Sequence, residues 1–157
     1  MGSERYIRAR GYGWLAEAAN DPEISKIARQ VGQEASAALV TEYGFDAAEQ
    51  TNWCERALAK YQDETIRDPI ERNARDPIRK LGLQDRILGP IHLCPAHSLP
   101  HPALLQTARS ALAYREPSDS AAVRLAELFE EHGPWGALRE VAPGVNQAFE
   151  EKFSPMG

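Results

Sequence analysis

The sequence predicts an all-α fold, a multi-helix bundle, and three observations support this prediction. Apolar residues recur at helical spacing, as in the run from Ile24 through Ile27 to Val31. No segment alternates β-branched and polar residues as a half-buried strand would. Asp-Pro pairs and glycines recur along the chain as helix starts and stops. At 157 residues, the chain is expected to form one domain.

The first half contains three expected helices. Residues 6–19 are Ala-rich and aromatic, and glycines at 11 and 13 are expected to interrupt a helix there. The run Asn20-Asp21-Pro22-Glu23 starts the next helix, which Gly44 ends as a left-handed cap. Asp46 then caps a third helix, with Glu49 completing a capping box. Its inner face should hold Trp53 or Cys54, followed by Ala57, Leu58 and Tyr61.

The second half shows more interruptions. Residues 85–97 are apolar, and Pro90 and Pro95 are expected to break or kink any helix there. A helix should cover about 102–114, and Ser118 should cap another that stops at Gly133. A further short helix opens after that glycine, and the tail forms at most a last turn. We expect one helical domain over residues 1–157, with flexible ends at 1–5 and 154–157.

Composition restricts the function classes. Lys and Arg number 18 against 23 Asp and Glu, for a net charge of -5, which argues against a nucleic-acid partner. No apolar run is long enough to span a membrane, and the N-terminus does not resemble a signal peptide. Two cysteines fit a reducing compartment, so a cytoplasmic location is expected.

The segment from Arg67 to Lys80, RDPIERNARDPIRK, gathers five cations in an otherwise acidic chain. Its first four residues, Arg-Asp-Pro-Ile, return eight positions later. Each Asp-Pro pair is typical of a helix start, so we expect two short helices with a bend between them. We name this segment the cationic corner and expect it to line a pocket for an anion or a polyol. Alternatively, it is a solvated face whose ion pairs contribute about 0–1 kcal/mol each.

A second cluster contains His92, Cys94, His97 and His101. Such ligands can hold zinc, but the spacing H-x-C-x2-H-x3-H matches no standard finger. Structural hydrogen bonding is the favoured interpretation, with no metal site. His101 lies at a proline-framed turn and is kept as a candidate substrate contact. No nucleophile elbow or Gly-rich phosphate loop is present, so no catalytic or cofactor-binding residue is assigned.

Three motifs carry a family resemblance: DPIERNARDPIRKL at 68–81, DRILGP at 85–90 and LPH at 99–101. With the Tyr-Gly-Phe-Asp junction at 43–46, they resemble the C-terminal domain of the polyol-specific long-chain dehydrogenases. Within that family, the mannitol-1-phosphate 5-dehydrogenases and mannitol dehydrogenases are most similar. The likeness runs from about residue 6 to residue 141. It implies a helical domain like that of the 6-phosphogluconate-dehydrogenase-like enzymes, and a sugar alcohol or its phosphate as substrate.

The resemblance also implies site residues and partners. Arg72 and Lys80 fall on two substrate-contacting positions, and Arg75, Arg79 and His101 match further motif positions. The family's general-base motif, K-x4-N-x2-H, and its NAD-binding Rossmann domain are absent from this chain. The expectation is therefore a domain that is inactive alone and works with a Rossmann domain or subunit that binds NAD.

Other functions remain open at this stage. The main alternative is a non-enzymatic helical interaction module whose cationic corner binds an acidic partner, and a small metal protein is a third. Apolar surface left exposed could also make the chain a homo-oligomer.

Overall fold

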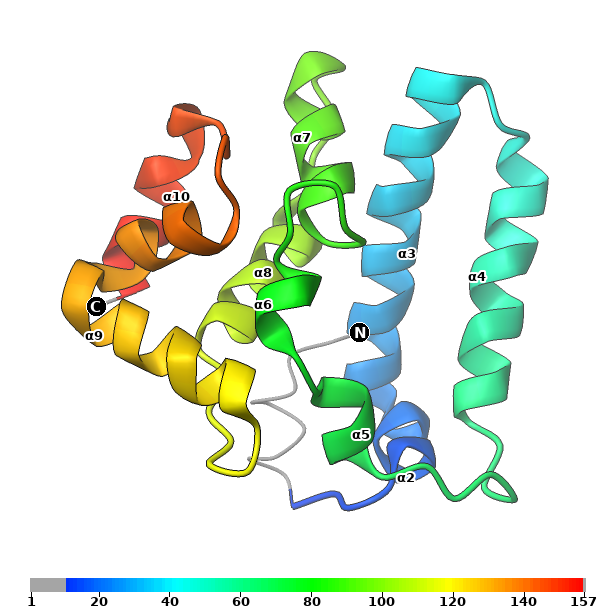
Figure 1. The fold of residues 1–157 in the computed structure, drawn as a ribbon. Coiled ribbons are helices and arrows are strands. Elements are labelled where there is room, and N and C mark those ends of the chain that lie inside the picture. Colours follow the sequence, from blue (N-terminus) through cyan, green and yellow to red (C-terminus); the bar gives the residue numbers. More distant parts are fainter. Residues whose placement is uncertain (1–10, 157) are drawn as a thin grey trace.

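The computed structural model describes residues 11–156, and these form an arrangement of helices without a sheet (Figure 1). The predicted all-α fold is confirmed for this part of the chain. Extended pairing there is limited to one isolated bridge, between Trp14 and Pro69. Within residues 11–156, no helix is both long enough and apolar enough to span a bilayer.

The N-terminal helices are α2 (Leu15–Asn20), α3 (Pro22–Tyr43) and α4 (Ala47–Tyr61), of which α3 and α4 form an antiparallel pair (Figure 1). The helix expected over 6–19 begins only at Leu15, and residues 6–10 lie outside the described part. The predicted bounds of α3 and the predicted start of α4 are confirmed, but the capping box expected at Asp46 is only half formed, because the Glu49 side chain makes no return bond to the Asp46 N–H. Asp21 accepts from the N–H groups of Glu23 and Ile24, and Asp46 accepts from that of Glu49. Gly44 closes α3 with φ 71°.

The middle of the chain contains α5 (Ile70–Ala74), α6 (Pro77–Lys80) and α7 (Leu88–Ala96). Pro90 and Pro95 were expected to break or kink a helix here, and they do not break it, because α7 runs through both. Pro90 lies in the first turn, where N–H groups have no partner within the helix and a missing donor costs little. Pro95 lies in the last turn, and the helix ends one residue after it.

The C-terminal part contains α8 (Pro102–Leu112), α9 (Ser120–Val141) and α10 (Glu150–Phe153), flanked by 3-10 turns η1 (Gln147–Phe149) and η2 (Ser154–Met156). The expected cap at Ser118 was wrong, since the Asp119 carboxylate accepts from the first turn of α9 and the Ser118 hydroxyl donates to Glu116. The predicted break at Gly133 corresponds to a non-helical residue, φ 72° and ψ 175°, inside α9. Of the two ends expected to be flexible, residues 1–5 lie outside the described part, and Met156 packs against the core.

The main core lies between α7, α8, α9 and α10, with α6 and α3 against it. Helix α8 is its centre, since most of its residues are buried. The core's fully buried large side chains include Leu81, Leu88, Ile91, Leu104, Leu112, Leu125, Leu138 and Phe153. Helix α4 lies outside this core and buries only Leu58.

Cys54, rather than Trp53, faces α3 from the inner side of α4. Its Sγ lies 3.5 Å from the Ser36 Oγ, and a Cβ added at Gly32 would lie 3.1 Å from the Cys54 Sγ. The two helices therefore pack closely through small residues. Trp53 is 71% exposed, and Tyr61, also expected on the inner face, is 41% exposed.

One buried carboxylate joins α3 to the core. Glu34 accepts hydrogen bonds from the backbone N–H groups of Ala103 (3.0 Å) and Leu104 (2.8 Å) in the first turn of α8. His101, at the N-cap position of α8, makes no side-chain cap of its own. Glu34 thus caps a helix some 70 residues away in sequence and places negative charge at the positive end of its dipole.

Removing this cap should lower stability measurably. Glu34→Ala leaves two buried N–H groups unpaired, so we expect a loss of about 2–3 kcal/mol in the free energy of unfolding. Urea unfolding followed by circular dichroism measures it. The matched control is Glu55→Ala, which removes an exposed pair with Arg29 and should change stability by about 0–1 kcal/mol. Equal losses in the two variants would show that Glu34 has no capping role.

Candidate functional site

The cationic corner contains two short helices, as predicted, but only one of its two Asp-Pro pairs is a capped start. Asp76 caps α6, accepting from the Arg79 N–H at 3.1 Å, with Pro77 at the first helical position. Asp68 does not cap α5, whose N-cap is Pro69. The Asp68 carbonyl instead accepts from the Leu15 N–H at 2.9 Å, and Ile70 donates to the Gly13 carbonyl. Pairing with the segment before α2 holds this backbone extended, so the predicted cap at Asp68 was wrong.

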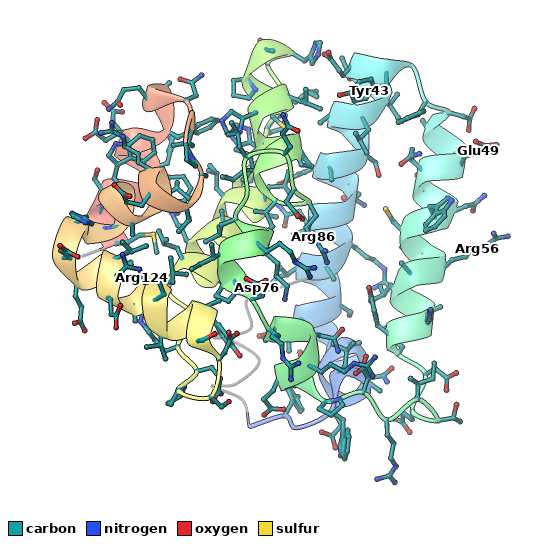
Figure 2. All side chains as sticks on the ribbon, in the orientation of Figure 1. Tyr43, Glu49, Arg56, Asp76, Arg86 and Arg124 are labelled. Atoms are coloured by element: carbon teal, nitrogen blue, oxygen red, sulfur yellow. The ribbon has the colours of Figure 1, made fainter. Side chains whose placement is uncertain are left out.

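The bend between α5 and α6 lies at Asp76, which is labelled in Figure 2, and the carboxylate of Asp119, the N-cap residue of α9, holds it. Asp76 has φ 60°, a left-handed conformation that Asp tolerates better than most residues. Its N–H donates to the Asp119 Oδ2 at 2.8 Å. The Asp119 Oδ1 accepts from Ala121 (3.0 Å) and Ala122 (3.4 Å), the first turn of α9. One side chain therefore caps α9 and holds the residue that caps α6.

Lys80 lies on the inner side of the corner. The residue is 5% exposed, and its Nζ donates to the Asn73 carbonyl in the last turn of α5. That carbonyl belongs to a helix end, where a cation satisfies an acceptor and favours the dipole. Lys80 thus connects α6 to α5 across the bend.

The arginines of the corner lie on its outer side. The side chains of Arg72 and Arg79 are 74% and 66% exposed, and Arg75 is exposed as well. The Arg72 Nη1 lies 3.6 Å from the Asp68 Oδ1, and the Arg79 Nε lies 3.8 Å from the Asp76 Oδ2. These separations exceed hydrogen-bond length, so the pairs hold the guanidinium groups only weakly. The exposed arginines of the corner therefore offer the paired N–H donors of their guanidinium groups, and the backbone that carries them is held in place.

His101 is positioned by a different set of contacts. Its Nδ1 lies 3.0 Å from the Leu99 carbonyl, and its ring meets that of Phe149 edge-on with centroids 6.1 Å apart. The structure brings Arg72, Arg75, Arg79 and Lys80 together on α5, α6 and their junction. Within residues 11–156, no hydrogen bond, ion pair or ring contact joins His101 to them.

A hollow lies at the start of the corner, where Arg67 lines it, but the sequence did not indicate that residues 14–17 would form its other wall. The hollow has a volume of about 310 Å³ and is lined by Trp14, Ala16, Glu17, Glu64, Ile66 and Arg67. The Arg67 guanidinium stacks over the Trp14 ring at 5.6 Å. Because Trp14 and Arg67 are far apart in sequence and form no motif, only the paired backbone of residues 13–15 and 68–70 brings them together.

A larger hollow, of about 600 Å³, lies at the second half of α9. Its lining includes His132, Arg139, Glu140 and Gln147. Neither hollow is lined by any of the five predicted substrate-binding residues.

The histidine and cysteine cluster is divided among separate structural contacts. The His92 Nδ1 lies 2.7 Å from the Leu88 carbonyl, and its Nε2 accepts from the Asn146 N–H at 3.2 Å. The His97 Nε2 lies 2.6 Å from a Glu42 carboxylate oxygen. Residues 11–156 contain no group of three or more His, Cys, Asp or Glu side chains placed to hold a metal ion.

Cys94 is fully buried in the core. Burial, with a smaller contribution from the negative charge of Glu34, raises the pKa of its thiol. Because the thiolate is the nucleophile, Cys94 is kept unreactive at neutral pH. This thiol therefore has a packing role.

One comparison with known proteins bears on this site. The family model described as the mannitol dehydrogenase C-terminal domain matches residues 7–146, most of the chain. The match includes the whole cationic corner and His101.

The difference between the two thiols predicts selective labelling. In the folded chain at neutral pH, a thiol reagent should modify half-buried Cys54 and leave buried Cys94 unmodified. Mass spectrometry of the Cys54→Ser and Cys94→Ser variants assigns each reaction, and a urea-unfolded sample gives the rate of each free thiol. Fast labelling of Cys94 in folded Cys54→Ser would contradict its burial.

The raised pKa of the Cys94 thiol also makes the stability of the folded chain depend on pH. Below the pKa of the thiol in the unfolded chain, its contribution to stability is fully present. This contribution is lost as the pH rises through the pKa of the thiol in the folded chain.

Proposed function

Because the chain belongs to the mannitol dehydrogenase C-terminal domain family, we propose that it is the substrate-binding domain of an NAD-dependent polyol dehydrogenase. Its substrate in this proposal is a sugar alcohol of the mannitol type or its phosphate. The domain orients that substrate for hydride transfer to NAD. The family match across the cationic corner is the observation that carries the proposal.

The chemistry of the corner supports this role. Guanidinium groups offer paired N–H donors that suit a phosphate or neighbouring hydroxyls. Arg72, Arg75 and Arg79 are exposed on a backbone that Asp119 and Lys80 hold in place. Donors on a fixed backbone lose less conformational freedom on binding than donors on a mobile loop. We assign substrate binding to these three arginines, with Lys80 and His101 as further candidates.

We assign the nucleotide to a different domain or subunit. A Rossmann phosphate loop needs a strand followed by a Gly-rich turn and a helix, and residues 11–156 contain no strand. The described residues therefore supply no Rossmann phosphate loop for NAD. In the proposal, a Rossmann domain or subunit binds NAD, which accepts the hydride, and this domain binds and orients the alcohol.

Binding of a sugar alcohol phosphate should depend on the exposed arginines. In isothermal titration with mannitol 1-phosphate, Arg72→Ala and Arg79→Ala should each weaken binding about tenfold or more, because a hydrogen bond to a charged group contributes about 1.5–3 kcal/mol. The matched control is Arg124→Ala, an exposed α9 arginine paired with Glu127, which should leave affinity unchanged. Mannitol without phosphate should bind more weakly. Indifference to both ligands, with capture of an acidic protein, would favour the alternative, an interaction module.

The chain alone should not oxidise a polyol. Purified residues 1–157 mixed with NAD and mannitol 1-phosphate should give no increase in absorbance at the wavelength of NADH, because no Lys-centred base motif is present. A complete mannitol dehydrogenase serves as the positive control for the assay. Steady NADH production by the isolated chain, lost in an Arg72→Ala variant, would refute the proposed division of labour.

A further inference from the structure

The outer face of α4, on the side away from α3, is exposed. Of its 15 residues, only Leu58 is buried, and Trp53 is 71% exposed. Trp53 places a large apolar ring on this face, and burying that ring against a partner would be favourable.

Four residues form a stripe along that face, at spacings of four, three and four: Glu49, Trp53, Arg56 and Lys60. Such spacing puts side chains on one side of a helix. The stripe lies opposite Leu58 and Cys54, which face α3. In Figure 2, Glu49 and Arg56 point away from α3 on the outer side of α4. Within residues 11–156, the Glu49 carboxylate and the Arg56 guanidinium have no ion-pair partner, and no cation stacks on the Trp53 ring.

We propose that the stripe is a homodimer surface, at which α4 helices of two copies pack antiparallel about a two-fold axis. In such a pairing, residues equally far from the midpoint face each other. The four positions of the stripe are arranged symmetrically about its midpoint, which lies between residues 54 and 55. Glu49 then faces Lys60 of the second copy, and Trp53 faces Arg56 of the second copy. Each contact occurs twice.

The order of charges favours a second copy over another partner. The stripe is acidic at its N-terminal end, basic at its C-terminal end and aromatic between them. The stripe of a second copy is therefore complementary to it only when the two helices run antiparallel. Arg over Trp is a favourable cation–π pair, and Glu against Lys completes the ends. Glu49 and Lys60 are 11 residues apart on one helix, roughly 16 Å, so they cannot pair within a chain. This proposal does not depend on the proposed substrate.

Charge reversal and rescue test the pairing. Sedimentation equilibrium of the 157-residue chain should show a reversible dimer, which Glu49→Lys or Lys60→Glu each weaken by about tenfold or more, because like charges then face each other. The double variant Glu49→Lys/Lys60→Glu should restore dimerisation. An equimolar mixture of the two single variants should also restore it, as a heterodimer. Trp53→Ala should weaken the dimer, and circular dichroism checks that every variant is folded.

The control is Glu151→Lys, a charge reversal on α10, where Glu151 is exposed; it should leave the dimer unchanged. A chain that stays monomeric at all concentrations overturns the proposal and favours a contact between the stripe and a different domain. A dimer that ignores the reversals overturns it as well, because its interface then lies elsewhere. Rescue by both the double variant and the mixture would establish the antiparallel register.

Discussion

The geometry of the cationic corner depends on one carboxylate, that of Asp119. It accepts from the first turn of α9 with one oxygen and from the Asp76 N–H with the other. Asp76 in turn caps α6, the helix that carries Arg79 and Lys80. Helix α6 has four residues, and isolated helices this short are unstable in water. Without the bond to Asp119, neither α6 nor its orientation relative to α5 would be stable. The position of the cations is thus set by a residue some 40 positions later in sequence.

The same device recurs elsewhere in the fold. Glu34 caps α8 from α3, and the Lys80 ammonium satisfies a carbonyl at the end of α5. In each case a charged side chain from one element satisfies backbone groups at the end of another. Because buried backbone groups left unpaired are costly, these contacts restrict how the helices can be arranged. Apolar packing around α8 then supplies the bulk of the stability.

Local sequence signals predicted most of the fold and only part of the site. Asp21, Gly44 and Asp46 act through neighbours within four residues, so their roles could be inferred from spacing. Asp68 resembles Asp76 in its surroundings, yet pairing with residues 13–15 keeps it from capping α5. Ser118 and Asp119 are both good caps, and the choice depends on the bond to Asp76. The burial of Lys80 could not be inferred from its neighbours either, because it depends on how α5, α6 and α9 pack.

These contacts explain how an acidic chain can hold a cluster of cations at a fixed bend, and they connect the helical fold to its proposed role in orienting a hydroxylated anion. The most direct test of that account is the hydrogen-exchange rate of the Asp76 amide, measured by NMR in the intact chain. We predict strong protection in the natural sequence and its loss in Asp119→Ala, with amides of the α8 core unchanged. An Asp76 amide that exchanges at the rate of an open loop, or stays protected without the Asp119 carboxylate, would contradict the account.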